Sequence, residues 1–135
     1  MRFAPPPDAG VGRGRPEKGT GAMAGGMQEP YRRVSPQEAQ QLIDGGATVI
    51  DVREPREQVQ DGRLPNATLV PLNTFLVNPR QYLEQDNVLF MCKVGQRSAI
   101  ACEMAAAVGM TRLFNLEGGI EAWKKQGLPV EFPQA

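Results

Sequence analysis

Short apolar segments alternate with segments of helical character along most of this chain. Residues 47–52 form a continuous apolar run that ends in polar residues, and the runs at 67–70, 88–91 and 112–116 are also of strand length. Residues 31–34 can add a short edge strand. A continuous run such as residues 47–52 is typical of a strand that is covered on both faces of a sheet.

Helices are predicted between these strands. Ser35, Pro36 and Glu38 form a helix start with an N-cap, a proline in the first turn and a capping box, and Gly45 ends that helix. Further helical segments are expected at residues 55–60, around Tyr82 and Leu83, at 98–108 and at 118–127, with breaks at Gly62 and Gly109. This alternation predicts a three-layer α/β fold, in which a mainly parallel central sheet has helices on both faces and function at the carboxyl ends of its strands.

The first 30 residues differ from the rest. They hold seven of the 15 glycines and five of the 12 prolines, with few bulky apolar side chains. Such a segment cannot bury enough surface to offset its ordering entropy, so we predict disorder for residues 1–30 and one domain over residues 31–135. A mitochondrial presequence is disfavoured because Asp8, Glu17 and Glu29 interrupt the segment.

Composition narrows the function classes. A chain of 135 residues suits one domain, and zero formal net charge indicates neither a nucleic-acid nor a membrane partner. Two cysteines are too few for a disulfide framework, and the absence of histidine argues against an ordinary zinc site or a Cys-His pair. We therefore expect a soluble, cytoplasmic protein without a metal or other cofactor.

Cys92 is the candidate nucleophile. It follows the apolar run at residues 88–91 and precedes a short loop with Gly95 and then a helix. Backbone N–H groups of such a loop can converge on one point, and the positive end of the helix dipole faces the same point. Lowering a thiol pKa from about 8.5 to about 6.5 requires roughly 2.7 kcal/mol, which two charge-assisted hydrogen bonds can supply.

The loop also resembles that of a known family. The rhodanese (thiosulfate sulfurtransferase) family has an active-site pattern that reads Cys, two residues, Gly, one residue, Arg, and then Ser or Thr. The resemblance implies Cys92 as the catalytic residue and a substrate-binding loop made of Lys93, Val94, Gly95, Gln96, Arg97 and Ser98. Related phosphatases of this fold have five residues between Cys and Arg instead of four, so the resemblance also favours sulfur over phosphate.

Two further segments are similar to signatures of the same family. One begins with Asp51-Val52-Arg53 and continues through Glu57 and Gly62, and the other runs over residues 115–123. Together with the loop, they extend the resemblance over roughly residues 31–130. Two departures concern the turn after Gly62, where Arg63 replaces a usual His and Asn66 replaces a glycine.

Other polar and sulfur-containing side chains have structural interpretations. Asp51 and Arg53 are expected to support the site by holding neighbouring loops, and Glu57 is expected to be structural, since an acid beside Cys92 disfavours its thiolate. Cys102 lies within the alanine-rich helix, where packing is favoured over a resolving role. Lys93 and Arg97 are expected to add positive potential for an anionic donor.

These features predict a sulfurtransferase. Cys92 would take a sulfane sulfur from a small-molecule donor such as thiosulfate, hold it as a persulfide, and give it to cyanide, a thiol or a protein acceptor. A persulfide carrier for a biosynthetic partner is one alternative, and a non-catalytic rhodanese-like interaction module is another, although the intact Cys92 and Arg97 argue against the module. A phosphatase or arsenate reductase is least favoured because the loop is one residue short.

Overall fold

The computed structural model describes residues 28–133 of the chain. The predicted disorder of residues 1–30 therefore lies almost wholly outside the described residues. Glu29, near the end of that segment, accepts hydrogen bonds from the hydroxyl of Tyr31 at 3.1 Å and from Nε of Arg33 at 2.8 Å. Among the described residues, no helix is both long and apolar enough to cross a membrane.

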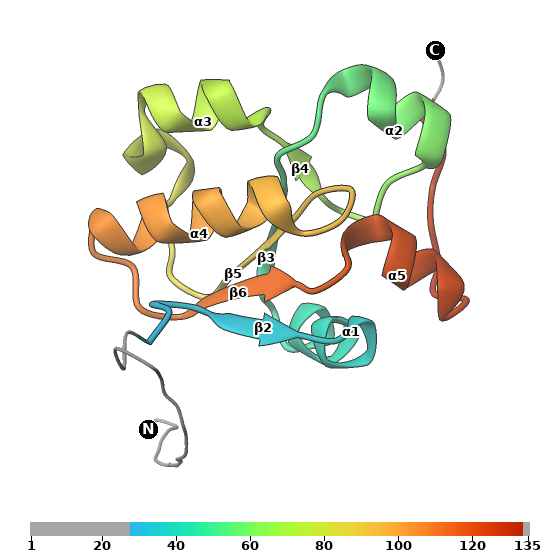
Figure 1. The fold of residues 1–135 in the computed structure, drawn as a ribbon, viewed down its shortest axis with the longest axis horizontal. Coiled ribbons are helices and arrows are strands. Elements are labelled where there is room, and N and C mark those ends of the chain that lie inside the picture. Colours follow the sequence, from blue (N-terminus) through green and yellow to red (C-terminus); the bar gives the residue numbers. More distant parts are fainter. Residues whose placement is uncertain (1–27, 134–135) are drawn as a thin grey trace.

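A five-stranded sheet forms the centre of the fold (Figure 1). Its order is β2-β6-β5-β3-β4, and each neighbouring pair is parallel, as the sequence predicts. The strands are β2 (Arg32–Val34), β3 (Thr48–Asp51), β4 (Thr68–Leu69), β5 (Val88–Met91) and β6 (Leu113–Leu116). All four residues of β5 and of β6 are buried, because helices cover both faces of the sheet.

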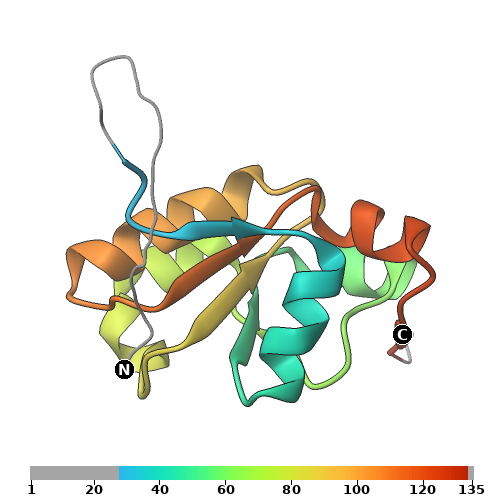
Figure 2. The ribbon, with the colours of Figure 1, turned by 90° about the horizontal axis from the view of Figure 1, so that it is seen from below.

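The helices divide between the two faces (Figure 2). Ala39 of α1 (Pro36–Asp44) and Trp123 of α5 (Gly119–Lys125) pack with Leu89 on one face. Phe75 of α3 (Leu72–Val77) and Ala101 of α4 (Gln96–Ala107) pack with Phe90 on the other. Adjacent strand residues thus contribute to two separate cores, which confirms the predicted three layers.

The segment before β5 differs from the prediction. A helix around Tyr82 and Leu83 was expected, but Tyr82 ends a 3₁₀ helix, η2 (Pro79–Tyr82), and Leu83 follows it. The preceding helix α3 has no counterpart in the sequence prediction. Its Phe75 ring lies 5.4 Å from the ring of Phe90 and 6.2 Å from that of Tyr82, so tertiary packing stabilises a segment whose local signals are weak.

The two departures from the family pattern are accommodated locally. Asn66 has a φ of 64°, a left-handed conformation that asparagine tolerates better than most residues, which explains how it can stand where the family has glycine. Arg63 forms an isolated antiparallel bridge with Glu131, with N–H···O=C distances of 2.7 and 2.8 Å. The turn after Gly62 is thereby tied to the C-terminal segment.

The strand order places the carboxyl ends of β3 and β5 side by side. Asp51, the last residue of β3, pairs with Met91, the last residue of β5. The chain leaves β3 towards β4 on one side and leaves β5 towards β6 on the other. Such a change of direction is where open α/β sheets place their ligand sites. The loop that begins at Cys92 and helix α2 (Pro55–Asp61), which follows β3, flank this point.

Candidate active site

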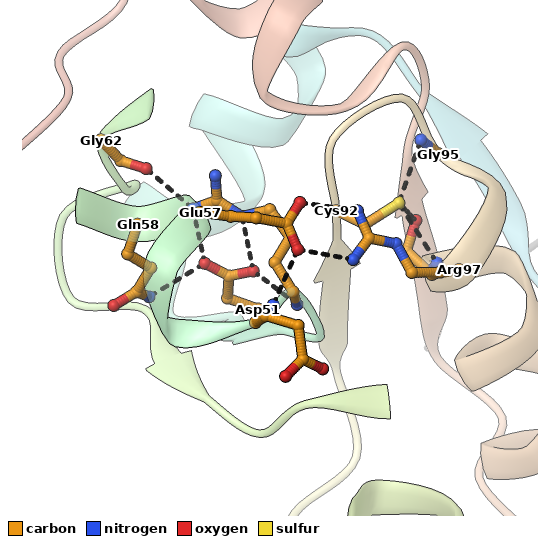
Figure 3. Close-up of polar contacts among 10 residues, drawn as sticks. Asp51, Glu57, Gln58, Gly62, Cys92, Gly95 and Arg97 are labelled. Carbon is orange, nitrogen blue, oxygen red and sulfur yellow. Dashed lines mark hydrogen bonds and ion pairs between the residues drawn. The ribbon is translucent and has the colours of Figure 1, made fainter. Parts of the chain in front are cut away.

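Cys92 lies directly after β5, and its sulfur faces a set of hydrogen-bond donors (Figure 3). The N–H of Gly95 donates to Sγ at 3.1 Å, and the N–H of Ser98 lies 3.4 Å away. The Ser98 hydroxyl oxygen is 3.3 Å from the same sulfur. Gly95 has a φ of 103° as the N-cap of α4, which turns the backbone so that these donors converge. We call this arrangement the sulfur cradle.

The sulfur cradle determines the acidity of Cys92. The side chain is 1% exposed, and burial alone raises the thiol pKa. The N–H groups of Ser98, Gly95 and Val94 donate towards the sulfur, and together with the nearby Ser98 hydroxyl they outweigh burial, so the pKa lies below its ordinary value. Aimed N–H donors at a helix N-terminus suit a sulfur anion and disfavour a metal cation.

A buried polar strand residue orients Ser98. Asn115 of β6 accepts a hydrogen bond from the Ser98 hydroxyl at 2.5 Å and donates its amide to the carbonyl of Gly95 at 3.1 Å. It thereby holds both ends of the loop. Sequence reasoning did not assign Asn115 to the site, although a polar residue within a buried apolar strand is a signal that could have identified it.

Helix α5 supports the loop from behind. The N–H of Ile120 donates to the carbonyl of Cys92 at 2.9 Å, and the N–H of Glu121 donates to that of Lys93 at 3.3 Å. With the carbonyls held outward, the neighbouring N–H groups turn inward to the sulfur. A Cβ at Gly119 would lie 2.2 Å from the Lys93 carbonyl oxygen, and φ there is +62°. Gly119 is therefore needed for this close approach.

Arg97 reaches across to α2. Its two terminal nitrogens each donate to a carboxylate oxygen of Glu57 at 2.8 Å. This pairing lowers the pKa of Glu57 to about 2 and raises that of Arg97. In the view of Figure 3 the guanidinium lies between the Glu57 carboxylate and the Cys92 sulfur. Glu57 therefore neutralises part of the positive potential that was expected from Arg97. The sequence alone did not reveal this pairing.

Asp51 and Arg53 form a fully buried ion pair behind α2. Arg53 Nε and Nη2 donate to the two carboxylate oxygens of Asp51 at 2.9 and 2.8 Å, and both side chains are 0% exposed. Nη2 also donates to the carbonyl of Gly62 at 2.8 Å, and Gln58 donates to Asp51 at 2.9 Å. The pair therefore fixes α2 to the end of β3, and through α2 it fixes Glu57.

The remaining predicted loop residues lie at the surface. Val94 is 46% exposed, Gln96 is exposed at the first position of α4, and Lys93 lies 3.8 Å from Glu121 in an exposed ion pair. Cys102 is buried within α4, and its Sγ lies 3.5 Å from the carbonyl of Phe114.

Iodoacetamide should label Cys92 before Cys102 at neutral pH. The sulfur cradle lowers the pKa of Cys92, whereas burial raises the pKa of Cys102. Because the thiolate is the nucleophile, the labelling rate of Cys92 should rise with pH through a midpoint below about 8.5. Peptide mass mapping across pH measures this. Equal labelling of both thiols, or a midpoint above that of a free thiol, would contradict the cradle's effect on acidity.

Comparison with known proteins identifies the class. The rhodanese-like domain family model matches residues 35–126, so the chain belongs to that family. Among curated relatives, a sulfurtransferase of Allochromatium vinosum is 34% identical over 64% of this chain and 79% of the relative. The thiosulfate sulfurtransferase GlpE of Actinobacillus pleuropneumoniae serotype 5b is 26% identical over 78% of this chain and 97% of its own length. An uncharacterized Synechocystis protein, slr1261, is 34% identical, and the chain spans 54% of it.

Solved structures agree on the fold. A rhodanese-related protein of Thermoplasma volcanium superposes with a TM-score of 0.65 at 34% identity, over 74% of this chain and 97% of that one. A Rhodopseudomonas palustris protein of unknown function, described as a possible tyrosine phosphatase, superposes with a TM-score of 0.67. It is 28% identical, and the match covers 75% of this chain and 85% of that one. The fold class is therefore confirmed, whereas the chemistry has to be argued from the site itself.

Proposed function

We propose that this protein is a sulfurtransferase that carries sulfur as a Cys92 persulfide. The observation that supports this most directly is the sulfur cradle, in which the N–H groups of Gly95 and Ser98 point at Sγ from 3.1 and 3.4 Å. A cradle of N–H groups stabilises a thiolate for attack and can equally stabilise a negatively charged persulfide. Family membership and sulfurtransferase relatives agree with this chemistry.

The proposed reaction has two steps. The Cys92 thiolate attacks the outer sulfur of thiosulfate, a new S–S bond forms, the old one breaks, and its electron pair leaves with sulfite. Cyanide or a thiol then attacks the outer sulfur of the persulfide, and the Cys92 thiolate is released. Mass spectrometry after incubation with thiosulfate tests the first step, since one added sulfur on the Cys92 peptide is expected and its absence would contradict the proposal.

The length of the Cys92 loop should determine whether the protein transfers sulfur or hydrolyses phosphate esters. We expect thiosulfate-dependent formation of thiocyanate with negligible hydrolysis of aryl phosphates, because four residues separate Cys92 from Arg97 and Arg97 is occupied by Glu57. Parallel assays with cyanide and with an aryl phosphate measure the two rates. Faster phosphate hydrolysis would favour phosphatase activity, which is described as possible for the Rhodopseudomonas palustris neighbour.

A persulfide carrier for a protein partner is the second candidate. The two cations of the loop, Lys93 and Arg97, are each within 4 Å of a carboxylate, at 3.8 Å and 2.8 Å. This pairing weakens the attraction that a small dianion would feel. Slow turnover of thiosulfate together with rapid transfer from a persulfide would favour the carrier function.

A further inference from the structure

The pair formed by Glu57 and Arg97 lies next to Cys92 in the view of Figure 3, and Arg97 belongs to the first turn of α4. Glu57 has three hydrogen-bond donors around its carboxylate: two nitrogens of Arg97 at 2.8 Å and the N–H of Glu54 at 2.9 Å. Its side chain is 16% exposed and that of Arg97 is 35% exposed. With a pKa of about 2, Glu57 is ionised throughout the neutral range.

This geometry has a consequence for anionic substrates. The negative charge of Glu57 cancels part of the attraction that Arg97 offers to an incoming anion. A dianion such as thiosulfate loses about twice as much attraction as a monoanion at the same position. Glu57 therefore weakens the binding of donors according to the charge next to their transferable sulfur.

We propose that Glu57 is a specificity-determining residue that disfavours dianionic sulfur donors and leaves the sulfur cradle to alkyl persulfides. The inference rests on the proposed function. With a persulfide, the Cys92 thiolate attacks the outer sulfur, the donor's S–S bond breaks, and the electron pair leaves on the donor thiolate. Charge then balances with one negative charge on each reactant and on each product.

The variant Glu57→Gln tests this role with little change of shape. Glutamine can occupy the same capping position at the start of α2, because its side-chain oxygen can accept from Glu54 N–H. Arg97 then keeps an uncompensated positive charge. Single-turnover loading of Cys92, followed by mass spectrometry at several donor concentrations, gives rate and half-saturation for thiosulfate and for cysteine persulfide.

We expect loading by thiosulfate to become about tenfold more efficient in Glu57→Gln, through a lower half-saturation concentration. Loading by cysteine persulfide should change less than about threefold, and the wild-type protein should prefer it to thiosulfate. Glu131→Gln is the matched control, since it removes a carboxylate outside the loop from an exposed ion pair with Arg63, in which the two side chains are 51% and 37% exposed. It should leave both donors nearly unchanged.

Several outcomes would overturn the inference. An equal change for both donors in Glu57→Gln would mean that Glu57 acts only through structure, and an equal gain in Glu131→Gln would mean that overall charge decides. If Glu57→Gln does not fold, a wild-type preference for thiosulfate over the persulfide still refutes the proposal. Sulfur loading from neither donor would refute the proposed function itself, whereas efficient loading from thiosulfate keeps that function and removes only this inference.

Discussion

Replacing Cys92 by serine should abolish sulfur transfer while leaving the fold intact. The serine hydroxyl can accept hydrogen bonds from the N–H groups of Gly95 and Ser98 that now point at Sγ. It cannot carry a transferable sulfur, so the rate should fall by at least about a thousandfold. Thiocyanate formation measures activity, and the free energy of unfolding should change by no more than about 1 kcal/mol.

Cys102→Ser provides the control for that experiment. Cys102 is 0% exposed, and its Sγ lies 3.5 Å from the carbonyl oxygen of Phe114, a long and weak hydrogen bond. A hydroxyl at this position needs a partner, so stability should fall by about 1–2 kcal/mol while activity remains. If Cys92→Ser keeps its activity, Cys92 is not the sulfur carrier. If Cys102→Ser loses activity without unfolding, Cys102 is more than a packing residue.

Replacing Arg53 by methionine should cost about 3–5 kcal/mol of stability. The change leaves the Asp51 carboxylate buried with Gln58 and the backbone N–H of residue 53 but without its cation, and it also removes the donor to the Gly62 carbonyl. Denaturant unfolding should show an earlier midpoint. Because α2 loses part of its attachment to β3, Glu57 should also be held less firmly opposite Arg97.

Arg33→Met is the matched control for the buried pair. Arg33 makes an ion pair with Glu29, but its side chain is 55% exposed and that of Glu29 is 40% exposed. Exposed pairs contribute roughly 0–1 kcal/mol because water screens them. Similar losses in Arg33→Met and Arg53→Met would show that burial of the Asp51 pair does not determine its importance.

The sequence predicted those parts of the fold that have local signals. Ser35 and Glu38 form the reciprocal capping box that their spacing indicates, at 3.1 and 2.9 Å. The predicted strand segments match the five strands that the structure describes within one or two residues at each end. The helix Leu72–Val77 was missed because its Thr, Phe and Val favour strands, and the burial of Phe75 against Phe90 is a tertiary effect.

The site, like the fold, could be predicted from the sequence only where the signal is local. The loop from Cys92 to Ser98 could be read from its motif, and the structure brings its N–H groups to one sulfur. Contacts between distant residues could not be read in that way. Glu57 and Arg97 are 40 positions apart, and Ser98 and Asn115 are 17 apart, so no local pattern connects them. The electrostatic character of the site depends on these distant contacts.

The attachment of the loop to α5 has a consequence for the nascent chain. A ribosome releases Cys92 well before Ile120 and Glu121, whose N–H groups hold the Cys92 and Lys93 carbonyls outward. The edge strand β2, made early, likewise waits for β6 before it can pair. Until α5 has been released and has docked, the thiol lacks its supported cradle and resembles any free cysteine. The lowered pKa of Cys92 should therefore arise only when α5 docks, and thiol acidity can serve as a reporter of that docking step.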